Sequence, residues 1–98
     1  MSCEWRVLKT KQFDKNLKRL LKSGVKKDLV DAAVEDLLRW VCREEPLPAK
    51  YNLHKLKGNL QDIWDIHLKY DLVLLFKLDE GSRCIYLLNI GPHSEVFK

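Results

Sequence analysis

The chain has 98 residues, of which 46% are hydrophobic and 33% charged, which is typical of a single globular domain over residues 1–98. The formal net charge of +4 comes entirely from residues 1–50, where 12 Lys and Arg face 8 Asp and Glu, and this surplus favours a polyanionic partner. A chain of this size excludes a deep cofactor cavity, and its longest apolar run, Leu72 to Phe76, is too short to span a bilayer.

A short strand and a helix are predicted first. Residues Trp5 to Leu8 alternate in polarity, as a strand does. Thr10 offers an N-cap hydroxyl to a following helix, and Gly24 is a suitable stop for it. One buried helical stripe is formed by Phe13, Leu17, Leu20 and Leu21.

A second helix is expected to begin at Asp28, a residue that can cap it, and to end before Pro46 and Pro48. Its apolar positions repeat at helical spacing, at Val30, Val34, Leu37 and Val41, with Ala33 and Leu38 widening the face. Only about four residues separate the two helices, so we expect an antiparallel helical hairpin.

After the proline-containing loop the period of the sequence changes from 3.6 to 2. Ile63 to Leu68, Leu72 to Leu78 and Ile85 to Ile90 are therefore predicted as three strands of an antiparallel β-meander. The fold class is α+β, with the most apolar strand in the middle of the sheet. One face of the sheet takes the helices, and the other is left open for catalysis.

The three cysteines, Cys3, Cys42 and Cys84, are an odd and widely spaced set without a C-x-x-C pair. This spacing indicates neither a disulfide framework nor a cysteine zinc site. The N-terminus also lacks an apolar secretory core. We therefore expect a soluble, cytoplasmic protein with reduced thiols and no membrane contact.

Four lysines align on the first predicted helix, opposite its apolar stripe. They fall at i, i+4, i+7 and i+11, and are Lys11, Lys15, Lys18 and Lys22. Such a face is either a solvated helix surface or a phosphate-binding surface, because aligned positive charges attract a polyanion and release its counterions.

All three histidines lie in the second half of the chain. His54 follows the proline loop, His67 points away from the core beside Asp65, and His93 follows the last strand, while Asp71 begins the middle strand. A histidine pKa of about 6.5 lets one ring accept a 2′-hydroxyl proton while another protonates a leaving oxygen near neutral pH. This clustering favours RNA cleavage.

A metal site is the competing use of these side chains, because imidazoles also bind zinc. The histidines are 13 and 26 residues apart, which matches no compact ligand motif. We therefore expect neither a metal nor another cofactor.

Downstream of His93, Phe97 either fills the core or presents an exposed ring that stacks on a nucleobase, worth about 1 to 3 kcal/mol.

Several segments of the second half form a recognisable set: Leu47-Pro-x-Lys-Tyr51, His54-Lys-Leu-Lys-Gly58, Asp65-Ile-His67, Asp71 and Gly91-Pro-His93-Ser-Glu-Val-Phe97. The set resembles the YafQ-type toxins of the RelE superfamily, which are type II toxin–antitoxin ribonucleases. The likeness covers residues 47 to 97, about half of the chain, and continues into a compatible helical hairpin before them.

The resemblance implies a RelE-like fold and a metal-independent endoribonuclease, an mRNA interferase that cuts mRNA on the ribosome and is inhibited by a cognate antitoxin. Its functional positions carry over as His54, His67, Asp71, His93 and Phe97. We add Lys55 and Lys57, which lie beside His54 in the sequence, as expected RNA contacts. Among these we predict His93 as the general acid, Asp71 or His67 as the base, and His54 as a phosphate ligand.

Three positions depart from the family pattern. Leu72 stands where some members have Trp, Trp64 where a polar residue is common, and Asn89 where Arg is usual. Arginine is suited to neutralise the transition state, so its loss slows catalysis or leaves the task to Lys55, Lys57 or Lys98. Two other functions therefore stay open: a non-catalytic regulator that binds the antitoxin, favoured by Asn89, and a basic RNA-binding module, which leaves the histidine cluster unexplained.

Overall fold

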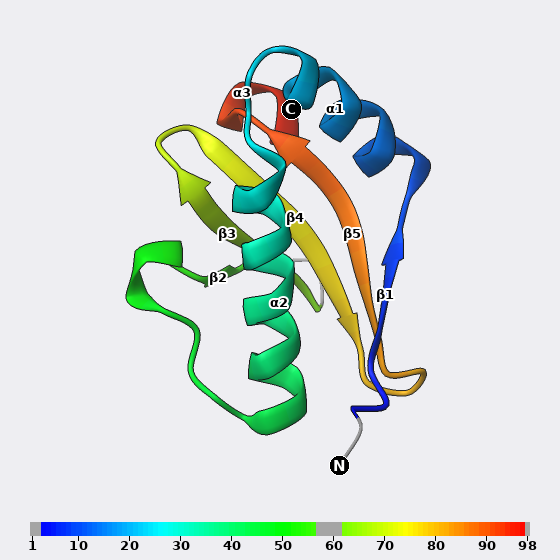
Figure 1. The fold of residues 1–98 in the computed structure, drawn as a ribbon. Helices are drawn as coiled ribbons and strands as arrows, with labels where there is room; N and C mark the ends of the chain where they lie inside the picture. The colour runs from blue at the N-terminus through cyan, green and yellow to red at the C-terminus, as the bar shows by residue number, and fades with distance from the viewer. Residues whose placement is uncertain (1–2, 57–61, 98) are drawn as a thin grey trace.

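The computed structural model describes residues 3–56 and 62–97 (Figure 1). In chain order the elements are β1 (Arg6–Lys9), α1 (Lys11–Lys22), α2 (Lys27–Arg43), the 3-10 turn η1 (Ala49–Tyr51), β2 (His54–Lys55), β3 (Ile63–Lys69), β4 (Leu72–Asp79), β5 (Cys84–Gly91) and α3 (His93–Val96). The expected α+β class is confirmed.

The strands form one sheet in the order β1-β5-β4-β3-β2. The meander of β3, β4 and β5 is antiparallel as predicted, and the apolar strand β4 is central. Two features of the sheet were not predicted. β1 runs parallel to β5, and the two-residue strand β2 pairs with β3 so that His54 lies opposite Asp65.

Thr10 connects β1 to α1 as the sequence predicts. Its side chain accepts a hydrogen bond from the Phe13 amide at 3.2 Å, and its hydroxyl donates to the Leu87 carbonyl at 3.0 Å. The helix ends at Lys22, and Gly24 has a φ of +110°, a conformation that glycine adopts without steric cost. The cap therefore also fixes α1 to the end of β5.

The prediction of Asp28 as the cap of α2 is wrong. The cap residue is Lys26, which makes no side-chain cap hydrogen bond, and Asp28 lies within the first turn. An acidic side chain there still interacts favourably with the positive end of the helix dipole, which explains why the local sequence resembles a cap. The helix ends at Arg43, where Glu44 takes a left-handed φ of 56°, before the two prolines.

Both long helices cover the same face of the sheet (Figure 1). α1 packs on β5, and α2 lies over β3, so the hairpin is spread across the sheet. The core consists of Phe13, Val30, Ala33 and Leu37 from the helices, Tyr51 from η1, and Ile66, Leu68, Leu72, Leu74, Phe76, Ile85, Leu87 and Ile90 from the strands. Trp64 packs edge-to-face against Trp40 with ring centroids 5.4 Å apart, so this departure from the family pattern fixes α2 to β3.

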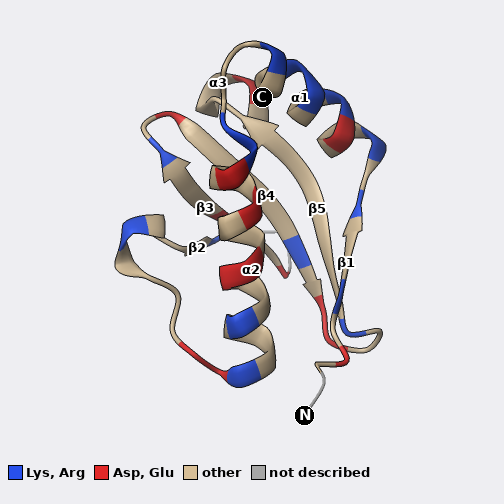
Figure 2. Ribbon diagram, viewed as in Figure 1, with Lys and Arg blue, Asp and Glu red and all other residues tan. Residues whose placement is uncertain are grey.

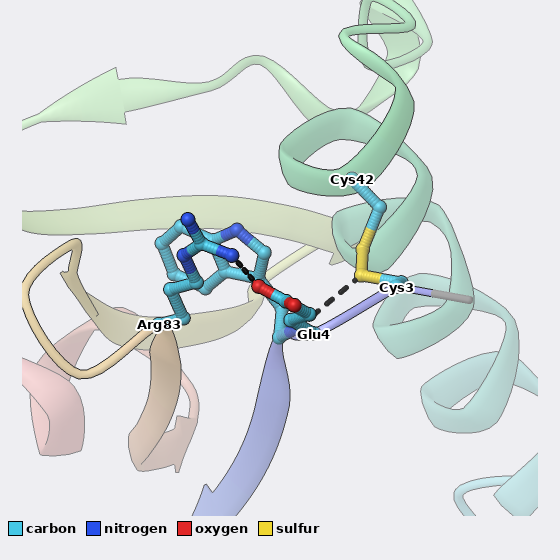
Figure 3. The surroundings of a disulfide bond; sticks show 5 residues. Cys3, Glu4, Cys42 and Arg83 are labelled. Carbon is cyan, nitrogen blue, oxygen red and sulfur yellow. Dashed lines mark hydrogen bonds and ion pairs between the residues drawn. A yellow bond between two sulfur atoms is a disulfide. The ribbon is translucent and has the colours of Figure 1, made fainter. Parts of the chain in front are cut away.

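A disulfide joins Cys3 to Cys42, so the expectation of three reduced thiols is wrong for these two residues (Figure 3). The segment before β1 runs beside the end of α2 and brings the two Cα atoms to 5.6 Å, a proximity that a separation of 39 residues does not reveal. Glu4 and Arg83 form an ion pair next to the bridge. Cys84 is free and buried.

Charge is distributed unevenly over the helices. Figure 2 shows mostly basic segments along α1, whereas α2 has a run of acidic segments with basic ones at its two ends. Lys11, Lys15, Lys18 and Lys22 are all exposed. Over the described part of the chain, no helix combines the length and the apolar character needed to cross a membrane.

Candidate active site

The histidines meet on the sheet face opposite the long helices. His54 comes from β2 and His67 from β3, where Ile66 and Leu68 on either side of it point into the core. His93 is the first residue of α3. The ring centroids of His54 and His67 lie 6.1 Å apart, and those of His67 and His93 lie 5.0 Å apart. The fold therefore sets three imidazoles in a row.

Asp65 is buried between the first two rings. One of its carboxylate oxygens lies 3.8 Å from His54 Nδ1 and 3.5 Å from His67 Nε2. Burial raises the pKa of the Asp65 carboxyl above its ordinary value, and the charges of His54, His67 and His93 only partly oppose this rise. The sequence analysis noted Asp65 beside His67 but did not place it among the site residues.

Asp71 holds His93 from the turn between β3 and β4. A single carboxylate oxygen accepts from the His93 backbone N–H at 3.0 Å and lies 3.2 Å from His93 Nδ1. The backbone hydrogen bond, followed by the side-chain contact, lowers the pKa of Asp71. When Nδ1 carries a proton toward Asp71, Nε2 is left to face a substrate. Asp71 is thus placed to orient the ring.

Two aromatic side chains border the site. Phe97 is 41% exposed and its ring centroid lies 5.6 Å from that of His93, so the ring stands outside the core. Tyr70, which the sequence analysis missed, is 98% exposed. It lines an open depression with His67, Asp71 and His93. An aromatic residue in a tight turn beside a candidate catalytic aspartate was the available signal.

The basic residues predicted to contact RNA do not all lie beside the histidines. Lys55 lies next to His54 on β2, exposed, with its ammonium 5.5 Å from the centre of the Trp64 ring. Lys57 and Lys98 fall outside the described residues. The four lysines of α1 belong to the helix side of the sheet, whereas the histidines are on the open side.

Metal-ligand geometry is present despite the sequence spacing. His54, Asp65 and His67 each offer one ligand atom, and these atoms all lie within 4.8 Å of one another. Two imidazole nitrogens and a carboxylate oxygen form a donor set that zinc and copper accept. The spacing argument failed because it considered only the three histidines, whereas β-pairing brings His54 opposite Asp65.

Comparison with known proteins gives consistent matches. A family model for the bacterial toxin of the type II toxin–antitoxin system, YafQ, matches residues 5–98. A metal-bound toxin from Helicobacter pylori is 36% identical, with a TM-score of 0.83 over 95% of this chain and 99% of that chain. No curated protein sequence matches this chain.

Two further solved structures share the fold. A copper-bound mutant toxin from Helicobacter pylori is 26% identical, with a TM-score of 0.81 over 95% of this chain and 99% of that chain. YafQ in the Escherichia coli DinJ–YafQ complex is 23% identical, with a TM-score of 0.84 over 97% and 99%. These structures confirm the fold that the resemblance implied.

Proposed function

The chain belongs to the YafQ family of bacterial type II toxins, and we propose that it is an endoribonuclease that cleaves mRNA on the ribosome without a catalytic metal. The observation that carries this proposal is the row of imidazoles on the open sheet face, with His93 oriented by Asp71. General acid and base groups placed within reach of one phosphodiester are what RNA cleavage requires.

In the proposed reaction the ribose 2′-hydroxyl attacks the adjacent phosphorus, and the bond to the 5′-oxygen breaks. His93 protonates the departing oxygen through Nε2. Since Asp71 already accepts two contacts from His93, it acts as the orienting group, and His67 takes the 2′-hydroxyl proton. His54 holds the phosphate, and Phe97 stacks on a base next to the cut. The products are a 2′,3′-cyclic phosphate and a free 5′-hydroxyl.

The partners follow from the same proposal. Residues 1–98 act as one toxin domain in the cytoplasm, where translating ribosomes supply the mRNA. A cognate antitoxin inhibits the toxin, as DinJ is the antitoxin of YafQ in the Escherichia coli complex. Figure 2 supports a polyanionic partner, because the basic residues gather on α1.

The chemistry of the cut ends tests this function. The protein is added to an in vitro translation reaction, and the 3′ ends of the mRNA fragments are treated with an enzyme that opens 2′,3′-cyclic phosphates before adaptor ligation. We expect fragments that ligate only after this treatment, and their loss when antitoxin is added. Intact mRNA in the presence of active ribosomes would instead favour a non-catalytic regulator.

A second candidate function, metal binding, is favoured by the ligand group and by the metal-bound Helicobacter pylori toxin. His54, Asp65 and His67 would hold a zinc or copper ion, which would engage the nitrogen lone pairs that acid–base catalysis needs. We therefore expect added Zn²⁺ to inhibit cleavage and a chelator to leave it unchanged. A chelator that abolishes cleavage, with zinc restoring it while the ribosomes stay intact, would make the metal catalytic.

A further inference from the structure

A second polar pocket, about 380 Å³ in volume, lies between α1, the end of β5 and α3. It is lined by Gln12, Asn16, Arg19, Asn89 and Glu95. Small-ligand sites fall in a range of about 300 to 1,000 Å³. The pocket is separate from the depression beside the histidines, because the two share no lining residue.

The helical period explains how α1 contributes to this pocket. Gln12, Asn16 and Arg19 are spaced at i, i+4 and i+7, so they form one stripe. This stripe runs between the apolar residues that face the sheet and the exposed lysines. The pocket is therefore flanked by the basic face of α1.

Asn16 organises the pocket from a buried position. Asn16 is only 6% exposed. Its Nδ2 donates a hydrogen bond to Asn89 Oδ1 at 2.5 Å, and its Oδ1 accepts one from Arg19 Nη2 at 2.6 Å. Asn89 Oδ1 also accepts from the Ile90 amide at 2.9 Å. The guanidinium of Arg19 is thus held in place while most of its five donors stay available.

The wall of the pocket combines donors and acceptors. Arg19 only donates, Glu95 only accepts, and the carboxamides of Gln12, Asn16 and Asn89 do both. A phosphate only accepts hydrogen bonds when ionised and is repelled by Glu95. The edge of a nucleobase presents donors and acceptors together, so this lining complements a base better than an anion.

We propose that this pocket binds a nucleobase of the RNA substrate, on the other side of α3 from the cleaved phosphate. His93 and Glu95 are two residues apart on α3, about 200° around the helix at 100° per residue, so they face opposite ways. One strand of RNA crossing α3 can then occupy both sites. This inference rests on the proposed ribonuclease function, and it makes Arg19 and Glu95 determinants of sequence preference.

Nucleotide titration tests the pocket without any cleavage. The ¹⁵N-labelled chain is titrated with AMP, GMP, CMP, UMP and inorganic phosphate at constant ionic strength, and the side-chain amide signals of Asn16 and Asn89 are followed by NMR. We expect these signals to shift with at least one nucleotide and not with phosphate. Arg19→Gln should weaken that binding about tenfold, whereas Arg6→Gln, an equal charge change on exposed β1, should not.

Shifts caused equally by phosphate would make the pocket an anion site and overturn the proposal, as would the absence of any shift.

A second experiment maps cut sites in translated mRNA. Glu95→Gln replaces one acceptor with a donor, so we expect a changed base preference near the cut, whereas Glu80→Gln in the β4–β5 turn should keep the wild-type pattern. If Glu95→Gln cleaves with the wild-type pattern, the nucleobase pocket is rejected and the ribonuclease function stands. If the wild type does not cleave, the ribonuclease function is rejected, and the nucleotide titration alone decides whether the pocket binds a base.

Discussion

Two aspartates flank the histidines, and their surroundings move their pKa values in opposite directions. Burial raises the pKa of Asp65, whereas hydrogen bonds from His93 lower that of Asp71. Such divergence between neighbouring carboxyls is common where each serves a different purpose. Here Asp65 lies between two rings, and Asp71 orients the third.

The difference predicts opposite effects on stability. Because the pKa of Asp65 is higher in the folded state than in the unfolded chain, the ionised carboxylate opposes folding. Asp65 therefore lowers the free energy of unfolding increasingly as pH rises from the ordinary value of 3.8 through the folded pKa. Asp65→Asn should therefore raise the free energy of unfolding at pH 8, and the gain should disappear near pH 3. Urea unfolding at both pH values measures this, and a variant less stable than wild type at pH 8 contradicts it.

Asp71→Asn is the matched control, with the opposite sign. Because the pKa of Asp71 is lower in the folded state, its ionised carboxylate stabilises the fold. This stabilisation is fully present above the ordinary value of 3.8 and is lost as pH falls through the folded pKa. This variant should lose stability at pH 8 and match wild type at low pH. Asn tolerates the left-handed φ of 51° at this position, so backbone strain does not confuse the comparison.

His93→Gln should reduce single-turnover cleavage of ribosome-bound mRNA by about 10² or more, because glutamine cannot deliver a proton to the leaving oxygen. Folding and antitoxin binding should persist, since the ring lies at the surface and its side chain is 50% exposed. Quenched-flow cleavage and thermal unfolding give the two readouts. A stable variant that cleaves at the wild-type rate would move the acid role to His54 or His67.

The sequence predicted the members of this site better than their contacts. His54, His67 and His93 could be found because the chain has only three histidines, all in its second half, and the resemblance to the YafQ-type toxins added Asp71 to them. The burial of Asp65 could not, because it depends on β2, a strand too short to leave a pattern of its own. The bond between Asn16 and Asn89 joins residues 73 positions apart, a separation at which local periodicity carries no information.

At the scale of elements, α1 combines three surfaces on one helix: apolar toward the sheet, polar toward α3, and basic toward solvent. Thr10 fixes their orientation, because its hydroxyl bonds to the end of β5. The sequence predicted this helix well, since a cap, a stripe and a stop are all local signals. The helix α3 was missed, since its four residues are fewer than a recognisable period requires.

Replacing Lys11, Lys15, Lys18 and Lys22 with Gln should weaken ribosome association and flatten its dependence on salt. Each lysine that contacts a phosphate releases about one counterion, so the slope of log K against log salt should fall by up to roughly four. Binding assays from low to moderate salt measure the slope, and circular dichroism checks the fold. An unchanged slope would reduce this face to a solvated surface.

The Cys3–Cys42 disulfide fixes the N-terminal segment to α2 and closes a loop of 39 residues in sequence separation. A loop of this length corresponds to about 4 kcal/mol of stabilisation by restriction of the unfolded chain. Oxidised protein should therefore unfold at clearly higher urea than protein in reductant. In Cys3→Ser the reductant should have no effect, and equal midpoints for oxidised and reduced wild type would show that the bridge contributes nothing.

At the scale of the whole molecule, the sheet separates two surfaces. The long helices and the basic face of α1 lie on one side, and the imidazole row lies on the other, where α3 and the β3–β4 turn border an open depression. A shallow site of this kind has few walls with which to orient a flexible strand of RNA. A large polyanionic partner that contacts the basic side could supply the missing orientation.

The protein should therefore cut mRNA in the ribosome far faster than the same mRNA free in solution. Free RNA rarely places the 2′-hydroxyl, the phosphorus and the leaving oxygen in line, whereas a ribosome-bound strand can be held in that arrangement. Such orientation lowers the activation barrier by several kcal/mol in well-oriented reactions. Single-turnover rates on both substrates at equal ionic strength measure the ratio, with His93→Gln as the control for contaminating nucleases. Equal rates would mean that the chain orients RNA unaided, and the basic face of α1 would then have to act on the RNA strand itself rather than on the ribosome.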